Sequence, residues 1–148
     1  MLAFRKPRLS DVPAMHLLME PHIRSEALLP RTPRAIVEHL RDYTLAVDEE
    51  GVVIGLASLS LVEVHLAELG AVVCQQPELM GSLVTRVLEE AQEIGVQRVF
   101  VLAPESAAYE ALGFQVTEIA DLPEKRDRQC LRCPRLPRCR QVAMVRDL

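Results

Sequence analysis

The sequence predicts an α/β (α+β) fold in which helices cover a central sheet. The longest predicted element is a helix after Pro77, because its apolar residues recur at the i, i+3, i+4 spacing of one helical face. These residues are Met80, Leu83, Val84, Val87, Leu88, Ala91 and Ile94. Residues 99–102 form a run of bulky side chains that is typical of a buried strand. Residues 48–51 lie between two apolar runs and end in Gly51, which indicates a hairpin turn.

The remaining elements follow from caps, breakers and apolar runs. The predicted strands span residues 4–8, 43–47, 52–59, 62–73, 99–102, 114–119 and 142–145. Two further helices begin at Ser10-Asp11 and Thr32-Pro33, where polar residues can cap a first turn, and a short helix spans residues 106–112. The order is β-α-α-β-β-β-α-β-α-β with a closing strand. We expect a single domain over residues 1–148, with an Arg/Pro/Cys-rich excursion at 123–141 before the closing strand.

Composition narrows the classes of protein that the chain can represent. With 148 residues, 49% hydrophobic and 26% charged, it can bury one core and is not a disordered chain. No apolar run approaches the roughly 20 residues of a membrane-spanning helix, and the start lacks a signal peptide. A cytoplasmic protein without a membrane partner is therefore expected. Eight of the 17 Lys and Arg residues lie between Lys125 and the C-terminus. That tail has no aromatic residue to stack on bases, so we expect anion binding and no nucleic-acid partner.

The stretch from Tyr109 to Phe114, Tyr-Glu-Ala-Leu-Gly-Phe, resembles the Tyr-x-x-x-Gly-Phe signature of the GNAT acyltransferase superfamily. The order of elements is similar as well. The resemblance implies a GNAT fold, with a mixed, mostly antiparallel sheet of about six to seven strands flanked by about four helices. It also implies that Tyr109 is the general acid that protonates the departing thiolate of acetyl-CoA. A tyrosine of pKa about 10 can donate to a thiolate of pKa about 8.5 without a special environment. Tyr109 could otherwise only pack a short helix.

The segment before the long helix, from Gln76 to Ser82, resembles the pyrophosphate-binding turn of the same family, Gln/Arg-x-x-Gly-x-Gly/Ala. Leu79 departs from the pattern at a glycine position where the backbone must approach phosphate, and Glu78 adds a negative charge. The helix N-terminus still offers N–H groups and a favourable dipole. The resemblance assigns acetyl-CoA binding to Gln76, Leu79, Met80, Gly81 and Ser82. The alternative is a catalytically weakened GNAT-fold binding or regulatory module.

Four segments are similar to the acetyltransferase domain of bacterial N-acetylglutamate synthases. They are residues 28–32, 67–69, 121–124 and 142–148. The similarity implies transfer of an acetyl group from acetyl-CoA to the amino group of a small amino acid, with glutamate favoured, in arginine biosynthesis. Most such synthases carry an amino-acid-kinase-like domain upstream. The chain is thus expected to be a short, stand-alone form, and a homodimer is a further expectation.

The resemblance gives Glu68 the role of the base that accepts a proton from the acceptor amine, directly or through water. Glu63 and His65 are rivals, because they lie on the same predicted strand. Side chains alternate along a strand, so residues 63, 65 and 67 face away from Glu68 unless a bulge intervenes. Glu68 could also be a strand carboxylate that only reaches solvent.

Arg31 resembles the arginine that binds a substrate carboxylate, a task for which a bidentate guanidinium is well suited. It could instead be a surface arginine beside a helix cap. In the family, backbone N–H groups of the long strand stabilise the oxyanion. In this chain the corresponding groups belong to Ala71 and Val72.

Three cysteines are clustered near the C-terminus, at Cys130, Cys133 and Cys139. The Cys-x-x-Cys pair has the spacing of a zinc or iron–sulfur site, but a structural zinc site needs a fourth ligand. Cys74 could supply it if the tail folds back over the long strand. Zinc at these cysteines is one hypothesis, and free thiols or an oxidised pair are the others.

Overall fold

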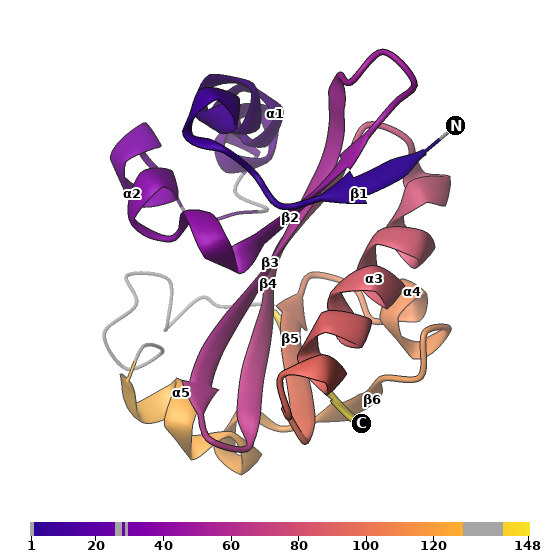
Figure 1. Cartoon of the computed structure of the whole chain (residues 1–148). Helices are drawn as coiled ribbons and strands as arrows, with labels where there is room; N and C mark the ends of the chain where they lie inside the picture. The colour runs from indigo at the N-terminus through magenta and orange to yellow at the C-terminus, as the bar shows by residue number, and fades with distance from the viewer. Residues whose placement is uncertain (1, 26–27, 29, 129–140) are drawn as a thin grey trace.

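The computed structural model describes residues 2–25, 28, 30–128 and 141–148, which form a sheet covered by helices on both faces (Figure 1). The strands are β1 (Ala3–Arg5), β2 (Tyr43–Val47), β3 (Val53–Glu63), β4 (Leu66–Cys74), β5 (Arg98–Ala103), β6 (Gln115–Thr117) and β7 (Val142–Asp147). They form one 7-stranded sheet in the order β1-β2-β3-β4-β5-β7-β6. Only β4 and β5 pair in parallel, which confirms the prediction of a mixed, mostly antiparallel sheet.

Five α-helices and four single turns of 3-10 helix connect the strands in the described part of the chain. The helices are α1 (Val12–Arg24), α2 (Pro33–Glu38), α3 (Met80–Glu93), α4 (Ala107–Glu110) and α5 (Pro123–Arg128). Figure 1 shows α1 and α2 on one face of the β2–β4 strands and α3 on the other. Helix α5 lies on the α1 and α2 side, against β3. In the same described residues, no helix combines the length and apolar character needed to cross a membrane.

Helix α3 forms as its apolar pattern predicts. Its buried residues are Leu83, Val84, Val87, Leu88 and Ala91. They pack in one apolar cluster with residues of β3, β4 and β5. The helix itself begins at Met80, because residues 77–79 form a separate 3-10 turn. Gly95, with φ at 93°, follows its end and supplies the left-handed conformation that glycine adopts without strain.

The two predicted N-terminal caps differ in outcome. Thr32 caps α2 as predicted, since its Oγ1 accepts a hydrogen bond from the backbone N–H of Ala35 at 3.1 Å. Asp11 does not cap α1. Its carboxylate accepts from the backbone N–H of Arg8 at 2.7 Å and from the guanidinium of Arg5 at 2.8 and 2.9 Å. The hydrogen bonds from Arg5 are the main reason that the pKa of Asp11 falls to about 2.

The prediction of one strand over residues 62–73 is wrong. The chain reverses at Val64 and His65, so that β3 ends at Glu63 and β4 begins at Leu66. Both strands lie in the interior of the sheet, and residues 61–67 are apolar except for Glu63 and His65, with no Gly, Pro, Asn or Asp to indicate a turn. Only exposure marks the reversal: Val64 is 91% exposed.

A β-bulge interrupts β4. Leu59 pairs with Leu69 and Ala57 with Val72, so Ser58 alone on β3 faces both Gly70 and Ala71 on β4. The extra residue reverses the side-chain alternation. Before the bulge, odd-numbered residues of β4 such as Leu69 pack with α3, whereas after it Ala71 and Val73 pack in the cluster that contains α1. The bulge follows Glu68, which therefore faces the α1 side.

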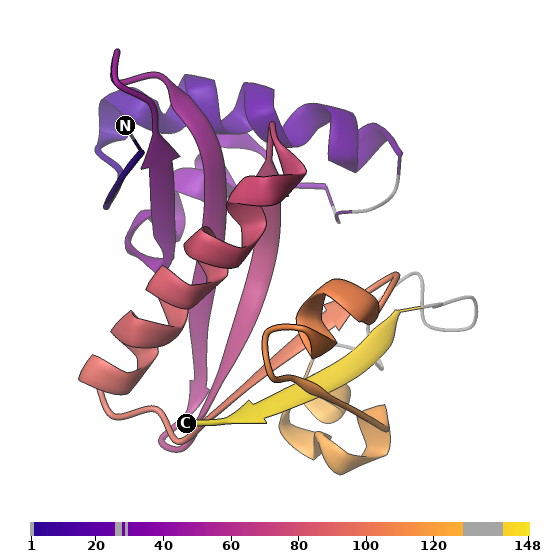
Figure 2. The same ribbon diagram turned by 90° about the vertical axis from the view of Figure 1, so that its right-hand side faces the viewer.

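Strands β4 and β5 pair over only three residues each. Leu66, Ala67 and Glu68 pair with Arg98, Val99 and Phe100. Beyond these residues the two strands diverge, with β3 staying beside β4 and β7 beside β5 (Figure 2). The part of β4 from Leu69 to Cys74 consequently has no β5 residue paired to its inner edge. This open edge lies between the two halves of the sheet.

Gly70→Ala is expected to lower the free energy of unfolding by about 1–3 kcal/mol. A Cβ at this position would overlap the Oγ of Ser58, whose side chain is buried. Urea denaturation measures the loss. The double variant Ser58→Ala/Gly70→Ala lacks the overlapping oxygen and should recover most of it relative to Ser58→Ala alone. Equal destabilisation by Gly70→Ala in both backgrounds contradicts the proposed steric cause.

Candidate active site

Tyr109 lies in the one-turn helix α4 with its side chain only 8% exposed. Gly113, with φ at 90°, turns the chain back so that the N–H of Phe114 donates to the carbonyl of Tyr109 at 3.0 Å. The two rings meet edge to face, with centroids 5.8 Å apart. The Tyr-x-x-x-Gly-Phe spacing thus lets Gly113 turn the chain so that Phe114 packs against Tyr109. Burial, together with a smaller effect of Cys74, raises the pKa of Tyr109 to about 12.

Cys74 ends β4 on the same side of the sheet as Tyr109 and packs against the same apolar cluster. Burial raises the pKa of its thiol to about 11. Burial therefore disfavours the thiolate of Cys74 in the same way that it disfavours the phenolate of Tyr109. Both groups are held in their protonated forms at neutral pH.

The predicted acetyl-CoA-binding turn borders a groove of about 540 Å³ at the N-terminus of α3. The groove is lined by Phe4, Glu78, Gly81, Ser82, Thr85, Arg86, Glu89 and Leu112. A Cβ at Gly81 would meet only the Cδ2 of Leu112, at 3.9 Å, and would otherwise project into open space. The N-terminus of a helix of this length binds phosphates through its N–H groups and dipole. Arg86, which the motif did not indicate, adds a positive charge.

Leu79 and Glu78 remain the two departures from the family pattern. Leu79 adopts φ −77° and ψ −20°, an ordinary helical conformation that does not require glycine. Glu78 lines the groove, so its carboxylate lies beside the segment that would hold phosphates. Gln76 is exposed just before the 3-10 turn, and Met80 is the first residue of α3.

Arg31 lies over β2, β3 and β4 on the α1 side of the sheet. Its Nη1 donates to the hydroxyl of the buried Tyr43 at 2.7 Å, and its guanidinium carbon stands 6.0 Å from the Tyr43 ring centroid. Its Nη2 would be 3.7 Å from a Cβ on Gly70. The guanidinium is therefore held by Tyr43 close to the Gly70 backbone, where the Oγ of Ser58 fills the place that a Cβ would take.

Glu68 is the last residue of β4 that pairs with β5. Its Oε1 lies 2.9 Å from the Nζ of Lys125, and the two side chains are 16% and 12% exposed. Sequence reasoning missed Lys125, because the residue appears only as the first of a basic tail and lies 57 positions from Glu68. The rivals Glu63 and His65 are exposed at the β3–β4 turn, and His65 Nε2 is 3.8 Å from Glu124 Oε1.

The structure distributes the predicted residues over both faces of β4. Tyr109 and the α3 N-terminus lie on one side, whereas Arg31 and Glu68 lie on the other. Ala71 lies in the bulge and Val72 follows it, on the part of β4 that has no paired β5 residue. Backbone N–H groups without a strand partner can donate to a ligand. The arrangement can receive an acyl donor from one side and an acceptor from the other.

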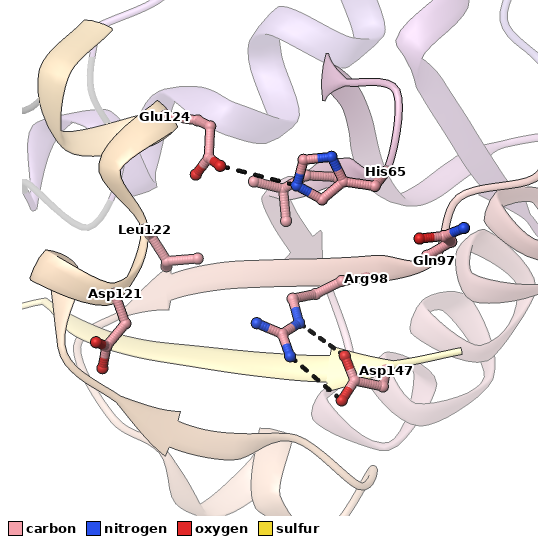
Figure 3. Close-up of a pocket in the computed structure, with 8 residues that line it drawn as sticks. His65, Gln97, Arg98, Asp121, Leu122, Glu124 and Asp147 are labelled. Atoms are coloured by element: carbon pink, nitrogen blue, oxygen red, sulfur yellow. Dashed lines mark hydrogen bonds and ion pairs between the residues drawn. The ribbon is translucent and has the colours of Figure 1, made fainter.

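A second pocket, of about 260 Å³, lies at the closed end of the two diverging strands (Figure 3). It is lined by His65, Leu66, Gln97, Arg98, Asp121, Leu122, Glu124 and Asp147. Arg98 Nε donates to Asp147 at 2.7 Å, and His65 faces Glu124. None of the residues predicted for catalysis or acetyl-CoA binding lines this pocket.

The cysteine cluster lies outside the described residues. This holds for Cys130, Cys133 and Cys139, while the first part of the predicted excursion forms helix α5. Within the described ranges, no three His, Cys, Asp or Glu side chains gather as a metal site would require. Zinc at the cysteines stays a prediction.

Comparison with known proteins supports the resemblance read from the motifs. No protein-family model matches the sequence. The chain is 32% identical over 149 residues to an uncharacterized N-acetyltransferase of Chlorobaculum tepidum, covering 97% of this chain and 95% of the relative. It is 31% identical over 126 residues to an amino-acid acetyltransferase of Mycobacterium tuberculosis, covering 80% of this chain and 70% of the relative.

A solved structure confirms the predicted fold. N-acetylglutamate synthase from Neisseria gonorrhoeae, complexed with coenzyme A and N-acetyl-glutamate, matches with a TM-score of 0.86 at 22% identity. The match covers 100% of this chain and 35% of that chain. The mixed sheet flanked by helices is thus the GNAT fold.

Gly81→Ala is expected to have opposite effects on stability and ligand binding. Alanine is the better helix former, so the free energy of unfolding should rise by about 0.5 kcal/mol. The added methyl group projects into the groove, so the Kd for acetyl-CoA, measured by isothermal titration, should increase severalfold. Gln92→Ala, at an exposed position near the other end of α3, is the control and should leave the Kd unchanged. Wild-type affinity in Gly81→Ala would remove this groove from the acetyl-CoA site.

Proposed function

Because the chain belongs to the GNAT superfamily of acetyl-CoA-dependent N-acetyltransferases, we propose that it acetylates the α-amino group of an amino acid, with glutamate favoured. The observation that carries the proposal is the position of Arg31, a guanidinium held by the Tyr43 hydroxyl on the face of β4 that also bears Glu68. A fixed guanidinium suits a substrate carboxylate. The name of the Mycobacterium relative and the ligand in the Neisseria synthase agree with an amino-acid acceptor. Glutamate as acceptor would place the reaction in arginine biosynthesis.

In the proposed reaction, the acceptor amine first loses a proton to Glu68, directly or through one water. The amine nitrogen then forms a bond to the thioester carbonyl carbon of acetyl-CoA. The oxygen of the tetrahedral intermediate carries a negative charge, which the N–H groups of Ala71 and Val72 stabilise. These groups are assigned because Ala71 lies in the bulge and Val72 follows it, on the part of β4 that has no paired β5 residue.

Collapse of the intermediate breaks the carbon–sulfur bond, the nitrogen releases its second proton to solvent, and the sulfur leaves as a thiolate. The Tyr109 hydroxyl donates its proton to that thiolate and later recovers one from solvent. Since the pKa of Tyr109 is raised to about 12, the hydroxyl is protonated at neutral pH, as a donor must be. The products are the N-acetylated amino acid and coenzyme A with a free thiol.

A catalytically weakened binding or regulatory module is the alternative. It is favoured by Glu78, whose carboxylate lines the groove proposed for the phosphates of acetyl-CoA. Leu79 at the glycine position of the family turn supports it as well. The ordinary helical backbone of Leu79 favours the enzyme instead, because a leucine there distorts nothing.

Thiol release from acetyl-CoA across a panel of amino acids tests the proposed activity. Glutamate should give the highest kcat/KM. Arg31→Met should raise the KM for glutamate at least about tenfold, the effect of one charge-assisted hydrogen bond, with little change in the KM for acetyl-CoA. Arg34→Met, at an exposed arginine that pairs with Glu38, is the matched control and should behave as wild type. Acetyl-CoA binding without thiol release on any amino acid would favour the binding module.

Tyr109→Phe should lower kcat by roughly 10²- to 10⁴-fold, the usual contribution of a general acid. The phenyl ring keeps the edge-to-face contact with Phe114, so the KM for acetyl-CoA and the unfolding temperature should change little. Steady-state kinetics and thermal unfolding measure these quantities. An unchanged kcat removes Tyr109 from the mechanism.

Several expectations from the sequence stay predictions. They are the single domain over residues 1–148, the cytoplasmic location, the homodimer, the lack of a nucleic-acid partner and zinc at the three clustered cysteines.

A further inference from the structure

The ion pair between Lys125 and Glu68 joins two segments far apart in the sequence at the centre of the proposed acceptor site. Both side chains are largely buried, and the ammonium and carboxylate are 2.9 Å apart. We propose that Lys125 binds the second carboxylate of a dicarboxylic amino acid and is the residue that selects such acceptors. This inference rests on the proposed function, which uses Arg31 and Glu68 but gives Lys125 no role.

Arg31 and Glu68 lie in adjacent rows on one face of the sheet, and Lys125 reaches Glu68 from α5. In the first row, Tyr43 pairs with Ser58, Ser58 lies opposite Gly70, and the Arg31 guanidinium lies over Tyr43 and beside Gly70. In the next row, Glu68 pairs with Ser60. Gly70 and Glu68 are two residues apart on β4, which corresponds to about 7 Å along a strand. Glu68 therefore lies one row from the Arg31 guanidinium and in direct contact with the Lys125 ammonium, which reaches it from α5.

An α-amino dicarboxylic acid carries the complementary pattern, with an ammonium group on the carbon chain between two carboxylates. With one carboxylate on Arg31 and the amine at Glu68, the second carboxylate reaches towards Lys125. An ammonium has three N–H donors and can contact two carboxylates at once. An acceptor with an uncharged side chain offers Lys125 no second anion.

The position of Lys125 is set by the packing of its own segment. Leu122, three residues earlier, is buried in an apolar cluster with Leu66 and Phe100. Glu124 faces His65 at the β3–β4 turn (Figure 3). Helix α5 is therefore fixed against β3 and β4 by contacts other than the ion pair, and a substitution at Lys125 should leave the helix in place.

The test compares glutamate with glutamine, which differs in having an uncharged amide in place of the second carboxylate. In Lys125→Met, the ratio of kcat/KM for glutamate to that for glutamine should fall at least about tenfold, mainly through the KM for glutamate. Lys125→Arg keeps the charge and should retain most of the preference. Lys6→Met is the matched control, because Lys6 also pairs with a glutamate, Glu90, at 3.1 Å but lies far from the acceptor face. Thermal unfolding verifies that each variant is folded.

The outcomes separate this inference from the proposed function. If wild type prefers glutamate and Lys125→Met loses activity on both acceptors equally, Lys125 has only a structural role and the inference is wrong. The inference is also wrong if Lys125→Met keeps the wild-type preference for glutamate over glutamine. If Lys125→Met does not fold, the inference is wrong when Lys125→Arg shows no such preference. If wild type releases no thiol with any amino acid, the proposed function itself fails and the assignment of Lys125 fails with it.

Discussion

The short parallel pairing between β4 and β5 is the constraint on which the rest of the structure depends. Three residue pairs join the two strands, and beyond Glu68 and Phe100 the strands separate. Each strand keeps an antiparallel partner on its outer side, β3 for β4 and β7 for β5, so the separation costs hydrogen bonds only along the inner edges. Buried backbone N–H and C=O groups need hydrogen-bond partners. The groups along the open inner edge of β4 have no β5 partner, so they can form hydrogen bonds with a ligand. The fold thereby places a ligand-binding edge between two stable halves.

The β-bulge at Gly70 and Ala71 determines which side chains face each half of the site. Because the bulge follows Glu68, that carboxylate faces the α1 side, together with Arg31 over Gly70. After the bulge, the alternation reverses, and Cys74 packs on the α3 side close to Tyr109. One strand can therefore carry a carboxylate towards an acceptor and an apolar edge towards an acyl donor.

Burial adjusts the acid chemistry on the donor side. The same desolvation that raises the pKa of Tyr109 to about 12 raises that of Cys74 to about 11. Burial therefore shifts both groups in the same direction, towards the protonated form. On the side proposed for the acceptor, the largely buried Glu68 and Lys125 pair with each other, as buried ionic groups must.

The sequence by itself determined the features that depend on neighbouring residues. These include the apolar stripe of α3, the Thr32 cap and the Gly113 reversal that brings Phe114 back to Tyr109, together with the order of elements. Local spacing was sufficient there because helices, caps and turns form from contacts a few residues apart. Tertiary structure decided the turn at Val64 and His65, the bulge and the pairing of Lys125 with Glu68. These depend on strand register and on how distant segments pack, and an apolar run between two interior strands contains no signal for either.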